Sequence, residues 1–272
     1  MTTAPLAPGR RGLRLQLRFP RRLALGATTL AVLLALWELV GVRQLVPFVV
    51  PFTDALSGAW SLVTSERLKT DVLPSAGRAL AGFLLGGSVG YVIGTLLGVL
   101  PTLERWTRPA LEFARATPVP ILIPVLFAAF GASSTTRIGL IALAAAWPVL
   151  LNATDGARAV DVRLLDAARV AGYGPVMRLR RVTVPAALPQ VFAGLRIALG
   201  LSLVMMVVSE MVSADSGLGQ FVLQSQRSFA LLDMYSGVLV LATLGGLFTA
   251  AFNLVERRAL RWYHGQKGMA HD

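Results

Sequence analysis

One charged stretch decides how this chain is organised: Asp161-Val-Arg163-Leu-Leu-Asp166-Ala-Ala-Arg169-Val-Ala-Gly172, followed by a basic linker and by Val182-Thr-Val184-Pro185. The part before Gly172 consists of helix formers without proline, and a glycine is suited to end a helix in the left-handed conformation. Arg163, Asp166 and Arg169 recur every third residue, so they share one broad helix face. We expect a short amphipathic helix with an abrupt stop. From these residues alone it is either a docking element or a solvated connector.

The composition is that of a membrane protein. Hydrophobic residues make up 55% of the 272 residues, and the mean hydropathy of +0.65 lies above the range of soluble domains. The net charge of +12 is compatible with nucleic-acid binding, but the basic residues flank apolar segments, which favours cytoplasmic loops and no nucleic-acid partner. There is no cysteine, and the two histidines, His264 and His271, lie in the polar tail. We therefore expect no catalytic residues and no metal site.

Six apolar segments are each close to the roughly 20 residues that cross about 30 Å of hydrocarbon. They are residues 23–40, 79–100, 116–136, 138–154, 197–214 and 234–255. Three prolines at 118, 120 and 124 should bend or delay the third segment, and residues 131–136 must form the turn before the fourth. The sequence predicts an all-α membrane protein with six transmembrane helices.

The basic residues predict the orientation of these helices. With the N-terminus inside, 20 of the 26 Lys and Arg residues fall in the inner segments. We expect cytoplasmic N- and C-termini in a multi-pass protein of the plasma (inner) membrane. The expected organisation is a basic tail over residues 1–22, a transmembrane domain over 23–256 with a cytoplasmic loop at 155–196, and a tail over 257–272.

The second apolar segment carries a stripe of small residues that predicts close helix packing. Glycines recur at every fourth position, at Gly82, Gly86, Gly90, Gly94 and Gly98. They leave one helix face nearly smooth, so that a second backbone can approach closely. The sequence leaves open whether that second helix belongs to the same subunit or to a partner.

Glu210 is the best candidate for a functional group inside a span, because an ionisable residue in a membrane segment is costly. The polar residues after it suggest a loop that returns partly into the outer vestibule, and a solvated outer loop is equally open. Residues of a translocation pathway in this region would be Ser209, Glu210, Ser213, Gln220 and Arg227. The competing interpretation of Glu210 is an interfacial carboxylate paired with a nearby arginine.

The charged stretch resembles the cytoplasmic loop of ABC importer permeases, whose pattern is E-A-A, three residues, G, nine residues and I-x-L-P. Residues 166–168 and Gly172 fall in register, with Asp in place of Glu, and residues 182–185 take the last places with Val in place of Ile and Leu. Further similarity to the nitrate/sulfonate/taurine branch lies in residues 117–131 and 208–219. The resemblance covers most of residues 30–262.

This resemblance implies the type I ABC importer permease fold and a subunit that hydrolyses nothing itself. Such a permease pairs with a second permease subunit, expected to be a second copy, and with two ABC ATPases that bind ATP and Mg. It receives a small anion such as a sulfonate, taurine or nitrate from an extracytoplasmic binding protein, and other small organic ligands remain open. The implied ATPase-coupling residues are Asp161, Leu165, Asp166, Ala167, Ala168, Arg169, Gly172 and Pro185.

The absence of a phosphate-binding loop agrees with a separate ATPase, because no G-x-x-x-x-G-K-[ST] motif occurs in the chain. Two other functions stay open at the level of sequence. One is a membrane enzyme or scaffold that has no ATPase partner. The other is an ion-coupled carrier, which usually shows inverted repeats and more intramembrane charge.

Overall fold

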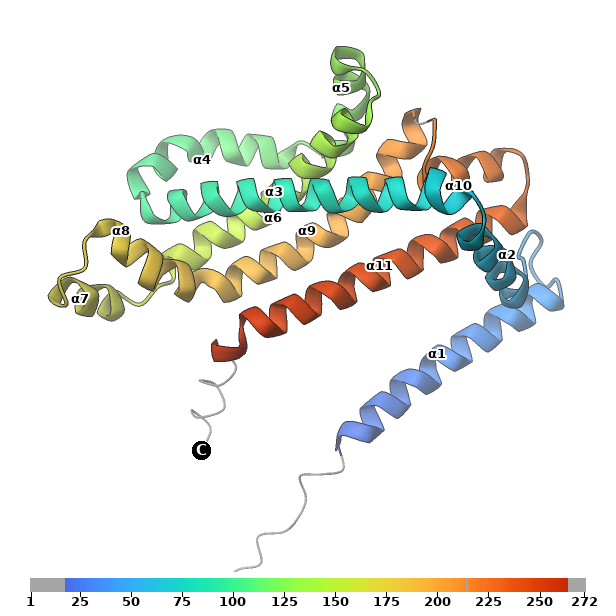
Figure 1. The fold of residues 1–272 in the computed structure, drawn as a ribbon, viewed down its shortest axis with the longest axis horizontal. Coiled ribbons are helices and arrows are strands. Elements are labelled where there is room, and N and C mark those ends of the chain that lie inside the picture. Colours follow the sequence, from blue (N-terminus) through green and yellow to red (C-terminus); the bar gives the residue numbers. More distant parts are fainter. Residues whose placement is uncertain (1–17, 214, 264–272) are drawn as a thin grey trace, which may run out of the picture. The chain divides into compact units, whose positions relative to one another are not determined.

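The computed structural model describes residues 18–213 and 215–263, and all regular structure in that part of the chain is helical (Figure 1). The chain divides into two compact units, Met1–Ala55 and Leu56–Asp272. Both histidines and most of the two predicted tails lie outside the described residues.

The first unit is built on α1 (Arg18–Val42), which contains the first candidate membrane span, Ala24–Val42. The chain after α1 folds back onto the end of this helix. Trp37 Nε1 donates to the carbonyl of Val50 at 3.0 Å, and the Glu38 carboxylate accepts from both the amide and the hydroxyl of Thr53. These bonds fix the start of α2 (Phe52–Thr64).

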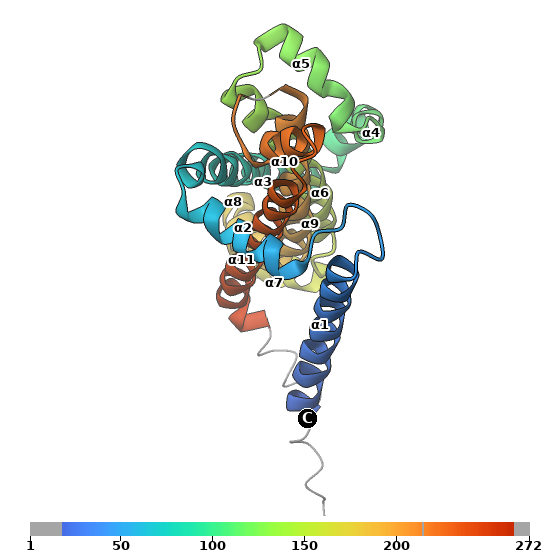
Figure 2. The ribbon, with the colours of Figure 1, turned by 90° about the vertical axis from the view of Figure 1, so that its right-hand side faces the viewer.

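The core of the second unit is formed by α3 (Leu73–Val99), α6 (Ser134–Arg158) and α9 (Val184–Ser213). A short π-helical turn, η1 (Leu68–Val72), precedes α3, and α11 (Leu231–Ala259) packs on the outside of the bundle. Figures 1 and 2 show α3, α6 and α9 running side by side. The two buried clusters of apolar side chains lie between these helices, one towards each end.

The glycine stripe of α3 lies against α6 of the same chain. A Cβ added at Gly86, Gly90 or Gly94 would meet backbone atoms of α6, at Ala142, Ala146 and Leu150 respectively. Gly82 and Gly98 meet Ile141 and Ala157 of the same helix. The approach is close enough for the Thr154 hydroxyl to donate to the carbonyl of Gly94 at 3.0 Å across the interface. Because backbone cannot move aside as a side chain can, glycine is required at the centre of this stripe.

The third predicted span needs correction. Residues 116–136 do not form one helix: α4 (Pro101–Ala116) ends at the first of them, and η2 (Val119–Ile121) and α5 (Leu122–Phe130) follow after a bend of 73°. Prolines 118 and 120 cause the break, because proline lacks an amide donor and pushes the preceding residue out of the helical region. Among the described residues, five helices are long and apolar enough to span a membrane, and the count reaches six when this bent pair is one span.

Two helix boundaries also differ from the predictions. The turn before α6 is shorter than residues 131–136, because Ser133 caps the helix by accepting the amide of Thr136 at 3.2 Å. The fifth predicted span begins well before residue 197: α8 (Pro175–Arg178), the π-helical turn η3 (Leu179–Thr183) and α9 form one apolar helical run, Pro175–Val212. Pro185 lies in the first turn of α9, where a missing amide costs little. The expected basic linker is therefore helical.

Candidate functional site

The charged stretch forms α7 (Val162–Val170), which stops at Gly172 as the sequence predicts and is capped at its start by Asp161. Asp161 Oδ1 accepts from the amide of Arg163 at 2.8 Å and so caps the first turn. At the other end Gly172 has φ of +78°, and the amide of Tyr173 donates back to the carbonyl of Ala168 at 2.9 Å. This left-handed ending stops the helix and turns the chain towards α8.

The surface of α7 combines apolar and charged side chains. Val162, Leu164 and Val170 are 66%, 53% and 91% exposed, whereas Ala168 is buried against the rest of the second unit. Asp166 and Arg169 form an ion pair of 2.8 Å within the helix. We expected the Asp166 carboxylate to contact a partner, and in the structure it is paired with Arg169 on a surface open to solvent. Figure 1 shows α7 and α8 at one end of the second unit and α10 (Leu218–Arg227) at the other.

The remaining predicted coupling residues lie on α7 and at the start of α9. Leu165 is half-buried on α7, Ala167 is exposed, and Pro185 is half-buried in the first turn of α9. The helical run Pro175–Val212, from α8 through α9, begins shortly after α7 and extends to the opposite end of the bundle. Glu210, on the last turn of α9, lies at that far end.

Glu210 forms the centre of a buried polar cluster, which we define as Asp71, Ser75, Arg78, Glu210 and the loop residues Ser216–Gly219. Glu210 itself has no exposed surface. Its Oε1 accepts from Arg78 Nη1 at 2.7 Å, its Oε2 accepts from the amide of Gly219 at 3.0 Å, and the Ser75 hydroxyl lies 2.8 Å from both oxygens. Both carboxylate oxygens thus accept hydrogen bonds, which is what a buried charge requires.

The same cluster fixes the loop between α9 and α10. The amide of Gly217 donates to Asp71 Oδ1, and the amide of Leu218 donates to the Ser75 hydroxyl, both at 2.9 Å. Arg78 Nη1 donates to the carbonyl of Ser216 at 3.3 Å. Gly217 has φ of +130°, and a Cβ there would lie 2.5 Å from the Glu210 carboxylate carbon. The loop therefore needs glycine for its conformation and for its contact with Glu210.

A second buried arginine lies near this cluster. Arg137 on α6 is only 4% exposed, and its guanidinium carbon lies 5.7 Å from the centre of the Phe127 ring. Arg78 Nε also reaches α6, where it donates to the Ser134 hydroxyl at 3.1 Å. Arg67, whose side chain is 54% exposed, pairs with Asp71 at 3.5 Å, so each of the two buried carboxylates, Glu210 and Asp71, has an arginine partner.

The five residues predicted to line a translocation pathway lie in different surroundings and do not form one group. Glu210 is in the cluster, and the buried Ser209 donates to the carbonyl of Met206 at 3.0 Å. Gln220 is half-buried on α10, and Arg227 is exposed at the other end of that helix. Ser213 ends α9, and its side chain lies outside the described part of the chain. The interpretation of Glu210 as a carboxylate paired with arginine matches the geometry, although the pair is buried instead of interfacial.

Our sequence reasoning missed the partners of Glu210. Asp71, Ser75 and Arg78 follow one another at four- and three-residue spacing, which places them on one face of a helix. That spacing could have identified a polar face at the start of the second span. The described residues contain no group of three His, Asp or Glu side chains arranged to hold a metal ion.

Comparison with known proteins gives consistent results. Residues 86–263 match the family model described as a binding-protein-dependent transport system inner membrane component. The chain is 32% identical over 241 residues to a putative aliphatic sulfonates transport permease protein, SsuC, of Bacillus subtilis strain 168, which covers 88% of this chain and 87% of the relative. It is 30% identical over 263 residues to the taurine transport system permease protein TauC of Escherichia coli K12, covering 93% and 95%. Its fold resembles a chain of the inward-facing MetNI methionine ABC transporter, with a TM-score of 0.55, 23% identity and coverage of 68% and 94%.

Proposed function

The chain belongs to the family of binding-protein-dependent transport system inner membrane components, and on that premise we propose that α7 converts ATP hydrolysis by partner subunits into movement of the membrane helices. It is a non-catalytic, multi-pass membrane subunit of an ABC importer of the nitrate/sulfonate/taurine branch. Permeases of this family work with ATPase subunits. The proposal concerns how this chain engages them.

The observation that carries the proposal is the continuous helical run from α8 through α9. This run begins beside α7 and ends at the polar cluster around Glu210. A displacement of α7 by the ATPases would pass along it as a rigid-body movement, because the backbone hydrogen bonds of a helix resist stretching and bending. The bundle would then alternate between an inward-open and an outward-open arrangement.

The surface of α7 supports its assignment as the ATPase-binding element. Two strongly exposed apolar side chains, Val162 and Val170, lie on one side of this nine-residue helix, and Leu164 is exposed on the other. On a segment outside the membrane, exposed valines on one side favour a protein contact, since water would otherwise surround them. Gly172 provides the sharp turn between α7 and α8, and the small side chain of the exposed Ala167 permits close approach of a partner.

The distribution of basic residues supports the orientation. In the proposed topology both termini and the loop 155–196 are cytoplasmic, and the polar cluster lies at the outer end of the bundle. The domains are the tail 1–22, the transmembrane domain 23–256 and the tail 257–272. Two ATPases, which bind ATP and Mg, would dock on the cytoplasmic side, and an extracytoplasmic binding protein would deliver the ligand near α10.

The uncovered apolar surface of α4 supports a second permease subunit, which we take to be another copy of this chain. Leu103, Trp106 and Phe113 are 44%, 80% and 78% exposed, and with Ala110 they follow the three- and four-residue spacing of helices that pair. The opposite side of α4 is tied to α6 by the ion pair between Glu104 and Arg158 at 2.8 Å. The ion pair therefore leaves the apolar side free for a partner helix.

The proposed substrate is a small organic or inorganic anion such as a sulfonate, taurine or nitrate. The names of SsuC and TauC support this class, since both relatives align over most of their length with this chain. Arg227 is exposed at the end of α10, where it would attract an anion released at the outer face.

Uptake of labelled taurine and of an alkanesulfonate, in cells that express the whole transporter, tests the coupling role. Gly172→Asp should abolish uptake, because it places a charged side chain at the left-handed turn that ends α7, and it should leave membrane insertion intact, because Gly172 is exposed and a Cβ there contacts nothing within 4 Å. Gly174→Asp is the matched control: Gly174 is also exposed and uncrowded but has φ of −65°, which any residue adopts. Normal uptake by the Gly172 variant would exclude the coupling role.

A further inference from the structure

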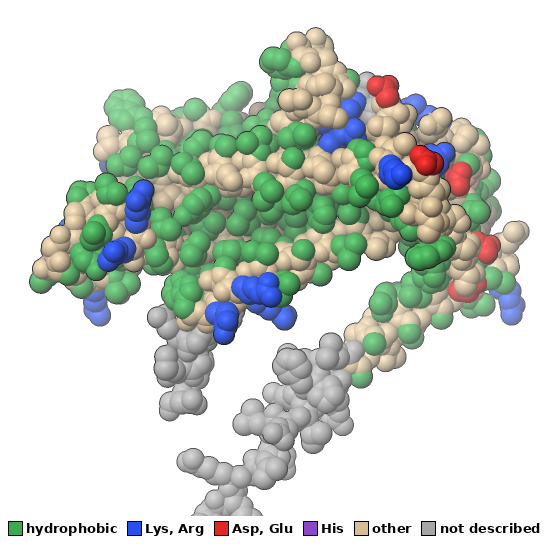
Figure 3. Space-filling view, in the orientation of Figure 1, with side chains coloured by type: hydrophobic (Ala, Val, Ile, Leu, Met, Phe, Trp, Pro, Cys, Tyr) green, Lys and Arg blue, Asp and Glu red, His purple; other side chains and the backbone are tan. Residues whose placement is uncertain are grey.

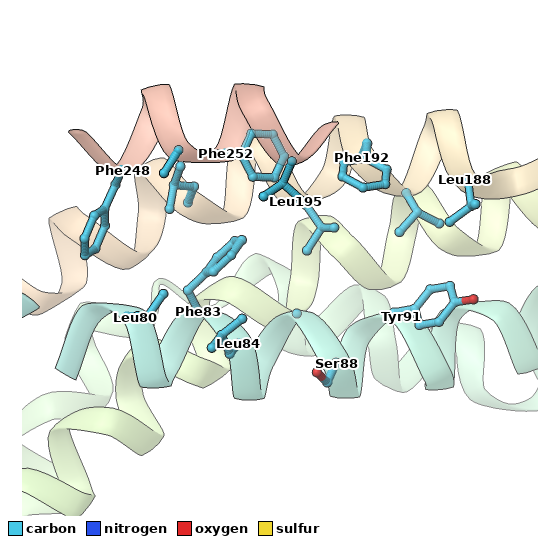
Figure 4. A pocket seen from close by; sticks show the side chains of 15 residues that line it. Leu80, Phe83, Leu84, Ser88, Tyr91, Leu188, Phe192, Leu195, Phe248 and Phe252 are labelled. Carbon is cyan, nitrogen blue, oxygen red and sulfur yellow. The ribbon is translucent and has the colours of Figure 1, made fainter. Parts of the chain in front are cut away.

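Two cavities in the second unit differ in the side chains that line them. The larger one, of about 570 Å³ between α3, α9 and α11, is apolar, and Figure 4 shows Phe83 and Phe252 facing each other across it. No charged side chain of the described residues lines it, so nothing there would select one apolar occupant over another. The smaller cavity, of about 210 Å³ between α3, α4 and α6, is lined by six charged side chains: Glu104, Arg108, Glu112 and Arg115 of α4, and Asp155 and Arg158 of α6.

Four of these six charges are explained by pairing within the chain. Glu104 and Arg158 form an ion pair of 2.8 Å between α4 and α6, with side chains 16% and 39% exposed. Arg108 and Glu112 form a second pair of 3.2 Å along α4. Elsewhere the bundle presents apolar side chains over most of its visible face, with Lys and Arg side chains towards its ends (Figure 3). The two remaining charges beside the cavity therefore need a separate explanation.

Arg115 and Asp155 are these remaining charges, and they come from different helices. Within the described part of the chain, neither takes part in an ion pair, although both line the cavity. A guanidinium group presents a planar fork of N–H donors that fits two oxygens of an oxyanion, and a carboxylate accepts hydrogen bonds from an ammonium group. Leu97, Leu111 and Leu150 also line the cavity, and such apolar side chains exclude water and so strengthen the attraction between charges.

The size of the cavity limits what could bind there. Pockets that hold drug-sized ligands have volumes of roughly 300–1,000 Å³, so a cavity of about 210 Å³ admits a smaller molecule and excludes a nucleotide or a whole lipid. No residue of α4, which the structure describes over its full length, is buried. A ligand that contacted Arg115 and Asp155 at once would therefore bridge α4 and α6 and hold α4 against the bundle.

We propose that this cavity binds a small dipolar molecule, with an oxyanion group at Arg115, an ammonium group at Asp155 and a short chain between them along the leucines. One free cation and one free anion in the lining match a ligand that carries both charges. Two sources share this chemistry, a free amino-sulfonate or similar solute and the headgroup of an ethanolamine phospholipid. The site goes beyond the proposed function, because binding here requires neither an ATPase nor movement of α7.

Saturation-transfer NMR of the full chain tests the match of charges. The protein is held in phosphatidylglycerol nanodiscs and titrated with three two-carbon probes: taurine, with a sulfonate and an ammonium group, isethionate, with the sulfonate alone, and ethylamine, with the ammonium alone. Taurine should bind at least about tenfold more tightly than either other probe, because each of them lacks one charged hydrogen-bonding group. Equal affinity for taurine and isethionate, or no binding of taurine at millimolar concentration, would overturn the proposal.

Substitutions assign the binding to this cavity. Arg115→Gln and Asp155→Asn should each weaken taurine binding roughly tenfold or more and leave the fold intact, since both side chains are exposed. Arg105→Gln on α4 and Asp233→Asn on α11 remove the same charges at exposed positions that do not line the cavity, and should leave binding unchanged. Wild-type affinity in both cavity variants would contradict the proposal.

The composition of the nanodisc distinguishes the two sources of the ligand. When phosphatidylethanolamine replaces part of the phosphatidylglycerol, loss of the taurine signal from the wild type would identify the lipid headgroup as the occupant. A taurine signal that persists and still depends on Arg115 and Asp155 would identify a free solute. Both results support a dipolar ligand at this site, whereas a persistent signal that is independent of the two residues would refute it.

Discussion

The buried ion pair of Arg78 and Glu210 predicts a large loss of thermal stability when Glu210 is replaced. Glu210→Ala removes the carboxylate that accepts Arg78, Ser75 and the amide of Gly219, so a buried guanidinium and a buried amide lose their acceptor. Breaking a buried ion pair from one side costs about 3–5 kcal/mol. For a chain of this length that lowers the melting temperature by roughly 6–20 °C. Glu210→Gln should also destabilise, because its amide NH₂ must face either Arg78 or Gly219, both of which are donors.

A matched control exists on α4. Arg108 and Glu112 form an ion pair of 3.2 Å whose side chains are 65% and 58% exposed. Glu112→Ala should therefore cost no more than about 1 kcal/mol, because surface pairs are well solvated before and after the change. The assay is thermal unfolding in detergent, followed by the loss of the monodisperse peak in size-exclusion chromatography.

A double-mutant cycle separates the pair from its surroundings. Arg78→Ala and Glu210→Ala should be strongly non-additive, because the double variant leaves no uncompensated charge and should cost clearly less than the sum of the single changes. Additive effects, or a Glu210→Ala variant as stable as Glu112→Ala, would refute the view that this cluster fastens the outer loop to α3 and α9.

Three further predictions concern packing, the helix stop and topology. Gly86→Ala should destabilise the detergent-solubilised protein by about 1–3 kcal/mol in the same assay, because the new methyl group meets the α6 backbone at Ala142, whereas Gly77→Ala on the same helix meets nothing and should be neutral. Gly172→Asn should retain more uptake than Gly172→Asp, because both side chains tolerate the left-handed conformation but only Asp adds a charge at the turn, and Gly172→Val should lose uptake because a β-branched residue does not tolerate it; equal activities would show that the turn is unimportant. Because the chain has no cysteine, single cysteines can report sidedness: Arg163→Cys should react with an impermeant maleimide only in opened cells and Gln226→Cys in intact cells, and the reverse pattern would invert the topology.

Much of the helical framework follows from local sequence. The limits of α7 were predictable because Asp161 and Gly172 act through bonds within a few residues of themselves. The glycine stripe predicted a close helix contact but not its partner, because spacing within one helix carries no information about which other helix approaches. That α6 takes this place is known only from the folded chain.

The polar cluster was beyond sequence reasoning for a related reason. Glu210 and Arg78 are 132 positions apart, and their contact depends on how α3 and α9 pack. The bent third span was partly foreseen from its prolines, yet α4 itself was missed because the charges on one face concealed an apolar opposite face. The assignment of α10 to a loop failed because its helix-forming residues follow Gly217, whose unusual conformation allows a helix to start immediately.

Co-purification of the tagged chain with the ATPase subunits of its own cells tests the central claim most directly. The account predicts that an ATPase carrying the G-x-x-x-x-G-K-[ST] motif is recovered with the wild type and with Gly174→Asp, and is lost with Gly172→Asp at unchanged membrane level. Recovery of the chain alone, or equal recovery of an ATPase by wild type and Gly172→Asp, would show that α7 is a connector and that coupling occurs elsewhere.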